Sequence, residues 1–125
     1  MRLLVCGGRD FEDRKFVFDS LDRIMQRRVV TLVIHGACQD RQGRLKGADR
    51  WADEWAEARL IERLPCPADW DRYGPKAGPL RNAHMLTHGP DGLTAFPGGR
   101  GTAGMVRLAK DAGVPVWAPE YTSSQ

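Results

Sequence analysis

The sequence lacks the features that mark membrane and secreted proteins. It contains no apolar run near the roughly 18 to 20 residues that span a bilayer, and its N-terminal apolar stretch, "RLLVC", is too short for a secretory signal. Cysteine is scarce, because the 125 residues include only three, widely spaced at Cys6, Cys38 and Cys66. An odd number without paired spacing predicts free thiols rather than a disulfide framework or a zinc site. We therefore expect a cytoplasmic protein with no membrane partner.

Familiar nucleotide-binding and metal-binding motifs are also missing. No G-x-x-x-x-G-K-[ST] segment occurs, and "CGGRDFED" does not match G-x-G-x-x-G, which disfavours a P-loop NTPase and an ordinary dinucleotide dehydrogenase. His84 and His88 are four residues apart, as metal ligands on a helix can be. No third ligand stands at a recognisable spacing, and no H-E-x-x-H is present. We expect no metal site and no required cofactor.

The composition is typical of one soluble globular domain. Hydrophobic residues make up 42% of the chain and charged residues 28%, within a length that builds a single core. We predict one domain over residues 1–120, followed by a short polar tail, 121–125. The net charge of +3 comes from charges of mixed sign along the chain, which fits a phosphate-bearing small molecule or nucleic acid and establishes neither. The densest basic cluster consists of Arg41, Arg44, Lys46 and Arg50. A solvated loop explains these charges as well as a binding role does.

Short apolar runs alternate with amphipathic stretches along the chain. Runs typical of strands lie at 3–6, 31–36, 93–96 and 114–118, with a further short extended piece near 63–67. Helical periodicity predicts helices around 17–25, over 47–64, over 78–89 and over 102–112, with Gly113 as the stop signal of the last. This alternation implies helical crossovers between parallel strands. We predict an α/β fold: a Rossmann-like, doubly wound, mainly parallel sheet of about five strands with helices on both faces.

Three of the expected strands end in a glycine-bearing loop. The first runs into Gly7 and Gly8, the second into Gly36 and Ala37, and the third into "PGGRGT" at 97–102. Because the carboxyl ends of parallel strands meet at the edge where this fold class binds ligands, we expect these loops to converge. Glycine lets backbone N–H groups approach an anion, and a helix starting at residue 102 adds its own free N–H groups. We therefore predict phosphate binding rather than a plain turn, through Pro97, Gly98, Gly99, Gly101 and Thr102. The further predicted ligand contacts in this region are Gly7, Gly8, Gly36, Ala37 and Asp49.

Four segments carry a resemblance to a known family: "CGGRDF" at 6–11, "HGA…GAD…A..WA" over 35–56, "W…G..AGPLRNAHM" over 70–85 and "FPGGRGT" at 96–102. The last resembles the P-G-G-x-G-T signature of the DprA/LOG-like superfamily, often called SLOG. The wider pattern resembles its small YspA-like branch, found in bacteria and phages. The resemblance spans nearly the whole chain in the right order. It implies a Rossmann-like domain that binds a nucleotide or a nucleotide-derived ligand.

The resemblance also raises an enzymatic alternative. Enzymes of this superfamily split the N-glycosidic bond of a nucleoside 5′-monophosphate, using a glutamate after the P-G-G-x-G-T loop and an arginine from a nearby helix. Here "AGM" at 103–105 follows the loop, so the glutamate is missing. Arg81 matches the arginine, while Asp10 and Asp49 are substitute carboxylates, although each acid also suits a turn or a helix start. The catalytic residues are therefore unknown, with Asp49, Arg81 and Asp10 as candidates.

Several other side chains have both a binding and a structural explanation. Arg9 is a predicted phosphate contact, as is Arg81, and Asn82 either reads a base or ribose or lies on a helix surface. His35 ends a strand, so it either lines the cleft or is a hydrogen-bonded structural histidine. Trp70 is a candidate for stacking on a base. The two tryptophans of the 47–64 helix are better explained as core or dimer contacts, which makes a homodimer reasonable.

The leading hypothesis is a nucleotide-binding domain that acts as a sensor, a carrier or a weak processing enzyme for a small phosphorylated, nucleotide-like ligand. The alternative from the enzyme class is a nucleoside 5′-monophosphate N-glycoside hydrolase of the LOG type with altered carboxylates. A third is single-stranded DNA binding of the DprA kind, which favours a continuous basic groove with stacking aromatics. Because the basic residues cluster mainly in one loop, nucleic acid is the weaker partner hypothesis.

Overall fold

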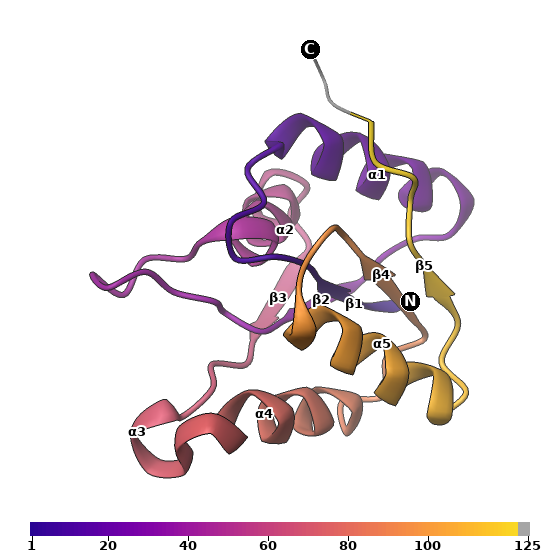
Figure 1. The fold of residues 1–125 in the computed structure, drawn as a ribbon. Coiled ribbons are helices and arrows are strands. Elements are labelled where there is room, and N and C mark those ends of the chain that lie inside the picture. The colour runs from indigo at the N-terminus through magenta and orange to yellow at the C-terminus, as the bar shows by residue number, and fades with distance from the viewer. Residues whose placement is uncertain (123–125) are drawn as a thin grey trace.

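The computed structural model describes residues 1–122, which form a parallel β-sheet flanked by helices (Figure 1). Neighbouring strands follow the order β3-β2-β1-β4-β5, and every pairing is parallel. The strands are β1 (Arg2–Cys6), β2 (Leu32–His35), β3 (Glu62–Pro65), β4 (Gly92–Ala95) and β5 (Val116–Trp117). The predicted α/β class and the five-stranded Rossmann-like sheet are confirmed. Residues 123–125 of the predicted tail lie outside the described residues.

Helices lie on both faces of this sheet, as predicted. They are α1 (Arg14–Arg27), α2 (Gly47–Ala58), the short α3 (Trp70–Tyr73), α4 (Ala77–Leu86) and α5 (Arg100–Asp111), with a 3-10 turn, Gly74–Lys76, between α3 and α4. α1 packs beside α2 on one face of the sheet, and α4 packs beside α5 on the other (Figure 1). None of the helices within residues 1–122 is long and apolar enough to cross a bilayer.

β1 lies in the middle of the sheet and is buried on both faces. Its residues alternate between two apolar cores, because successive side chains of a strand point to opposite faces. Leu3 and Val5 pack in the core with α1 and α2, where Trp55 is fully buried. Leu4 and Cys6 pack in the core under α4 and α5. The continuous hydrophobicity of β1 therefore reflects a strand covered on both sides, as the sequence pattern indicated.

The cysteines are free thiols, as predicted. Burial raises the pKa of the Cys6 thiol to about 12, so this thiol stays protonated and unreactive near neutral pH. The tryptophans of α2 also serve the fold. Trp55 is a core residue, and the Trp51 indole Nε1 donates to the Phe11 carbonyl at 3.0 Å. Because this helix face packs within its own chain, it gives no support to the homodimer, which stays a prediction.

The helix predicted over 47–64 ends earlier, at Ala58, and 62–65 forms β3 instead. The helix ends in a Schellman motif in which Leu60 takes the left-handed conformation with a φ of 57°. The Ile61 N–H donates to the Ala56 carbonyl at 2.8 Å, and the Leu60 N–H donates to the Glu57 carbonyl at 3.2 Å. Glycine usually occupies this position, so a leucine there carries no stop signal that a sequence pattern could reveal.

The start of the last helix also differs from the prediction, whereas its end does not. α5 begins at Arg100 with Gly99 as its N-cap, so Thr102 lies inside the first turn rather than at the helix start. Gly113 has a φ of 77°, and the next N–H, that of Val114, donates to the Ala109 carbonyl at 2.9 Å. This Schellman arrangement confirms Gly113 as the stop signal.

Candidate functional site

The loops that follow β1 and β4 meet at the point where the strand order reverses. From β1 the chain proceeds to β2 and β3 on one side, and β4 and β5 extend the sheet on the other. The Gly8 N–H donates to the Pro97 carbonyl at 2.8 Å, which joins the two loops directly. In doubly wound sheets, this reversal opens a crevice outside the carboxyl ends of the strands, where ligands bind. The convergence expected from the sequence is therefore present between these two loops.

Some glycines of the two loops are required by packing alone. A Cβ at Gly7 would lie 2.5 Å from the Ala48 Cβ and 2.9 Å from the Phe96 Cβ. A Cβ at Gly8 would lie 2.8 Å from the Pro97 carbonyl oxygen, and one at Gly98 would lie 2.7 Å from the Gly8 nitrogen. Since real Cβ atoms do not approach backbone this closely, these three glycines allow β1, β4 and α2 to pack together.

Gly99 and Gly101 have a different environment. Both are exposed, and a Cβ at either position would meet no atom within 4 Å. Gly99 is the N-cap of α5 and makes no side-chain hydrogen bond to the helix. Its carbonyl accepts from the Ala103 N–H at 3.0 Å. The first N–H groups of a helix have no partner within the helix and carry a partial positive charge. The start of α5 therefore presents open backbone donors and the side chain of Arg100.

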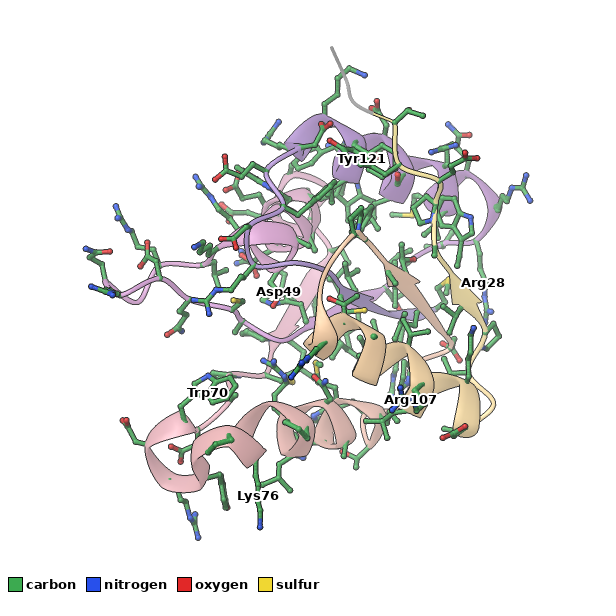
Figure 2. All side chains as sticks on the ribbon, in the orientation of Figure 1. Arg28, Asp49, Trp70, Lys76, Arg107 and Tyr121 are labelled. Carbon is green, nitrogen blue, oxygen red and sulfur yellow. The ribbon has the colours of Figure 1, made fainter. Side chains whose placement is uncertain are left out.

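A cavity of about 330 Å³ lies against this loop. Its walls come from the end of β4, the first turn of α5 and the segment that follows β5: Ala95, Phe96, Pro97, Gly98, Gly99, Thr102, Ala103, Ala118, Pro119 and Tyr121. Tyr121 is fixed by edge-on packing against the rings of Phe11 and Phe16, each with a centroid distance of 4.9 Å (Figure 2). Its hydroxyl also bonds to Asp13 Oδ2 at 3.0 Å. The last described residues thus form one wall of the hollow beside the glycine loop.

The loop after β2 is held by a buried carboxylate. Asp49, at the start of α2, is 6% exposed and accepts a hydrogen bond from the Cys38 N–H at 3.0 Å (Figure 2). Burial raises the pKa of the Asp49 carboxyl, and hydrogen bonds from the Cys38 and Gly36 N–H groups oppose that shift. Ala37, between them, has a left-handed φ of 50°. Asp49 therefore has a structural role, because it holds this left-handed backbone turn in place. Its predicted contact with a ligand would come in addition to that role.

Arg81, from α4, links three parts of the carboxyl edge. Its Nη1 donates to the carbonyl of Gly36 after β2 and, at 3.4 Å, to that of Cys66 after β3. Its Nε donates to Asn82 Oδ1 at 3.0 Å, and Asn82 Nδ2 donates to the Gly101 carbonyl of α5 at 3.3 Å. Asn82 is 6% exposed, so its expected place on a helix surface is wrong. Its hydrogen bond from α4 to the glycine loop had no signal in the sequence pattern.

The close contact between Gly36 and Arg81 explains the glycine after β2. A Cβ at Gly36 would lie 2.5 Å from Arg81 Nη1 and 3.2 Å from Asp49 Oδ2. Glycine here makes room for the guanidinium rather than for a positive φ, because no positive φ is found at this residue. The structure thus brings Gly36, Asp49, Arg81 and Asn82 together on one side of the P-G-G loop. The 330 Å³ cavity lies on the side of Tyr121, and none of these four residues lines it.

His35 is a structural histidine, one of the two explanations offered by the sequence. It is fully buried, its Nδ1 accepts from the Ala37 N–H at 3.0 Å, and its Nε2 lies 2.8 Å from Asp53 Oδ1. Because Nδ1 accepts a hydrogen bond, the ring proton of the neutral form sits on Nε2 and is donated to Asp53. Asp53 also accepts from Arg63 Nη1 at 3.0 Å. The pair joins α2 to the end of β2.

Asp53→Ala is expected to lower the free energy of unfolding by about 1–3 kcal/mol, because it leaves a buried His35 Nε2–H without an acceptor. Urea denaturation measures this. Glu54→Ala is the matched control on the same helix, since Glu54 is about one-third exposed and pairs with Arg50 at 2.9 Å, a surface bond worth about 0–1 kcal/mol. Equal losses in the two variants would show that the His35–Asp53 contact contributes nothing.

The remaining candidate acids and cations lie closer to solvent. Asp10 is 81% exposed at its side chain and pairs with Lys46 at 3.0 Å. The hydrogen bond from Lys46 lowers the pKa of the Asp10 carboxyl, which favours an ionised surface group over a general acid. Arg9 is exposed, and burial raises the pKa of Cys38 on the loop after β2, a shift that the charge of Arg9 opposes in part. The role of Arg9 as a phosphate contact stays a prediction.

Gly47 belongs to the site's framework but had no predicted role. Its φ is 67°, and a Cβ there would lie 2.4 Å from the Gly8 carbonyl oxygen and 2.5 Å from that of Arg9. The first turn of α2 thus rests on the backbone of the loop after β1, and the Ala48 N–H donates to the Gly8 carbonyl at 3.1 Å. Its place in "GAD", just after a basic loop, was the signal available from the sequence.

Two further expectations concern aromatic and metal-binding residues. Trp70 is 57% exposed at the start of α3, with its ring against Gly78, whose Cβ would lie 3.2 Å from the Trp70 Cη2 (Figure 2). Base stacking on Trp70 stays a prediction. His84 and His88 lie edge to face with centroids 5.0 Å apart. Within residues 1–122, no group of three or more histidine, cysteine, aspartate or glutamate residues could hold a metal ion.

Two comparisons with known proteins agree with this geometry. Residues 1–73 match the family model described as the YspA, cpYpsA-related SLOG family. The chain is also similar to the Gene 61 protein of Mycobacterium phage D29, with 38% identity over 123 residues that cover 92% of this chain and 93% of the phage protein. The family match includes the loops after β1 and β2 and the whole of α2. The chain therefore belongs to the YspA, cpYpsA-related SLOG family.

Proposed function

We propose that this chain, as a single domain over 1–120, binds a nucleotide or a nucleotide-derived small molecule at the crevice between β1 and β4. Its family membership supports a nucleotide-related binding role. The observation that carries the proposal is the junction of the two glycine loops. The Gly8–Pro97 hydrogen bond fixes the loop at the strand reversal, and immediately beyond it the first turn of α5 is open.

A phosphate is the group that best fits this opening. Helix N-termini bind phosphate because their free N–H groups point at the anion and the helix dipole favours negative charge. Gly99 and Gly101 leave the approach unobstructed, and the exposed Arg100 adds a cation. Arg81 supplies a second, partly buried cation across the carboxyl edge, held by its bonds to the Gly36 and Cys66 carbonyls. Arg9 supplies a third, exposed one from the loop after β1.

The same site argues for binding rather than for hydrolysis of the N-glycosidic bond. No carboxylate occupies the positions just after the loop, where "AGM" stands. Asp49 is nearly buried and already accepts backbone hydrogen bonds, while Asp10 is a surface ion pair with Lys46. Glycoside hydrolysis needs a carboxylate that reaches the sugar or a water beside it. We therefore propose a sensor or carrier of a small phosphorylated ligand.

A thermal-shift screen tests the proposal. Full-length protein is heated with nucleoside monophosphates, ADP, NAD, ADP-ribose and cyclic dinucleotides, and with inorganic phosphate as the minimal probe. A ligand at about 100 times its Kd stabilises the folded state by about 2.7 kcal/mol, so at least one nucleotide is expected to raise the melting temperature by several degrees. The proposal fails if no member of the panel shifts it.

Two further arms separate the alternatives. Chromatography for free base after incubation with each nucleoside monophosphate is expected to show no turnover. Release of free base would instead support the hypothesis of an N-glycoside hydrolase. Titration with single-stranded DNA at increasing salt tests the third hypothesis. DNA affinity that falls steeply with salt and ignores added nucleotide would favour a nucleic-acid role instead.

Gly36→Ala is expected to weaken nucleotide binding by about tenfold while leaving the fold intact. The new Cβ would overlap the Arg81 guanidinium, 2.5 Å from Nη1 and 2.8 Å from Cζ. The guanidinium is the end of a flexible side chain, so it moves at low cost and loses its bonds to the carboxyl edge. Isothermal titration calorimetry measures the affinity, and Gly104→Ala, in open space on α5, is the control. Unchanged affinity in Gly36→Ala would remove Arg81 from the site.

A further inference from the structure

A second cavity lies away from the carboxyl edge. It has a volume of about 550 Å³ and opens between the second half of α1 and the strands β4 and β5. α2 packs across β1, β2 and β3, whereas α5 packs on β4 and β5 from the opposite face. The cavity therefore lies on the face of β4 and β5 opposite α5, between these strands and α1 (Figure 1). A volume of this size matches small-molecule sites, which span about 300–1,000 Å³.

The floor and one wall of this cavity are apolar. Leu3 and Thr94 line it from the sheet, and Ile24 lines it from α1. Trp117 lines it from β5 with its side chain 38% exposed, which is a large aromatic surface left open to solvent. An aromatic and aliphatic lining of this kind favours the burial of an apolar body.

Thr94 provides a polar group inside this apolar lining. The residue is 1% exposed, and its Oγ1 is buried without a hydrogen-bond partner in the described part of the chain. A buried hydroxyl left unpaired costs about as much as a lost hydrogen bond, so such groups in native proteins call for a partner. Because this Oγ1 is itself buried, a molecule seated in the cavity does not reach it without a shift of the lining.

The rim of the cavity is cationic. Arg23 and Arg27 line it from α1 and Arg28 from the residue that follows the helix, and all three are exposed (Figure 2 shows Arg28 beside β5). The one carboxylate in the lining, Asp91, already accepts from the Arg2 N–H at 2.8 Å. That hydrogen bond is the main cause of the lowered pKa of Asp91, with Arg28 adding to it. The Arg23 guanidinium lies 5.6 Å from the Trp117 ring centroid, at the mouth of the cavity.

We propose that this cavity is a second binding site, which takes a small amphipathic anion. The apolar body of the ligand lies over Leu3, Ile24 and Trp117, and its carboxylate or phosphate group is held by the arginines of α1. Guanidinium groups bind such anions through paired, charge-assisted hydrogen bonds. The site is independent of the nucleotide crevice, because its lining shares no residue with the glycine loops.

Titration of the full-length protein with decanoate, kept below its micelle concentration, tests this site. Calorimetry and tryptophan fluorescence are expected to show saturable binding of decanoate and none of decyltrimethylammonium, which has the same tail and the opposite charge. Trp117→Phe is expected to keep the calorimetric binding and to lose the fluorescence change. Equal binding of the two amphiphiles, or no binding of decanoate, would overturn the proposal. Self-association at rising protein concentration without decanoate binding would assign the face to a second copy of the chain and overturn it too.

Paired double variants test whether the arginines of α1 bind the anionic group of decanoate. The double variant Arg23→Gln with Arg27→Gln is expected to weaken decanoate binding by about tenfold or more. Arg107→Gln with Lys110→Gln removes the same charge from α5, on the other face of the sheet, and is expected to change nothing (Figure 2 labels Arg107). Thr94→Val keeps the shape of the floor and removes only the buried hydroxyl, so the affinity for decanoate is expected to change little. Equal affinities in the two double variants would contradict the proposed site.

Discussion

Gly47→Ala is expected to lower the free energy of unfolding by about 3 kcal/mol or more, the sum of a backbone penalty and an overlap with backbone atoms. The penalty arises because Gly47 has a φ of 67°, a conformation that residues with a Cβ rarely adopt. The overlap arises because the new Cβ would lie 2.4 Å from the Gly8 carbonyl oxygen and 2.6 Å from the Arg9 carbonyl carbon. Backbone cannot rotate away as a side chain does, so α2 and the loop after β1 must separate.

Gly43→Ala is the matched control for this prediction. Gly43 also has a positive φ, 80°, but a Cβ there would meet no atom within 4 Å. Its substitution therefore carries the backbone penalty alone, about 1–2 kcal/mol. Urea denaturation of the two variants separates the terms. Similar losses would mean that α2 does not rest on the loop after β1, and the framework of the candidate site would be wrong.

Gly99→Asp is expected to abolish nucleotide binding while raising the stability of the free protein. Gly99 has a negative φ of −100° and open space around it, so an aspartate side chain meets no neighbouring atom. Aspartate is a preferred N-cap residue, and its carboxylate accepts from N–H groups of the first turn, which adds a few tenths to about 1 kcal/mol. The same carboxylate occupies the place of the phosphate and repels it. We expect at least about a hundredfold loss of affinity, because like charges in contact cost several kcal/mol.

Two variants distinguish the charge from the cap. Gly99→Asn gives α5 a neutral cap and is expected to retain part of the affinity. Gly104→Asp puts the same charge on α5, in equally open space but beyond its first turn, and is expected to bind nucleotide as the parent protein does. Calorimetry measures binding, and thermal unfolding measures stability. If Gly99→Asp binds as tightly as the parent, the phosphate does not lie at the start of α5.

The sheet could be predicted because its signals are local. Short apolar runs and helical periodicity located β1, β2, β4, β5 and every helix except the short α3, and the alternation of the two predicted a parallel arrangement. Most of β3 fell inside the helix predicted over 47–64. Two helix boundaries were wrong for physical reasons. At Leu60 the structure uses a left-handed residue other than glycine. At Gly99 the helix starts without a side-chain cap, so the stronger capping residue Thr102 was the misleading signal.

The sequence predicted where the candidate site lies, but not which of its residues support the fold and which are open to a ligand. The sequence placed the glycine loops at one edge, yet it could not separate Gly8, which is needed for packing, from Gly99, which is open. That difference depends on which backbone lies opposite each glycine, a property of the tertiary fold. Likewise, the roles of Asp49 and Asn82 come from loops that are distant in sequence. A side chain that holds such a loop looks the same in sequence as one that holds a ligand.

The most direct test of the nucleotide site is a titration of the ¹⁵N-labelled protein with AMP, followed by backbone amide chemical shifts. Because free N–H groups at a helix start become hydrogen-bonded to a bound phosphate, we expect the largest shifts at Gly99, Arg100, Gly101 and Thr102. Inorganic phosphate is expected to move the same amides by less. The account is contradicted if AMP leaves these amides unmoved, or if its largest shifts fall in the α1–β5 cavity or in the basic loop that precedes α2.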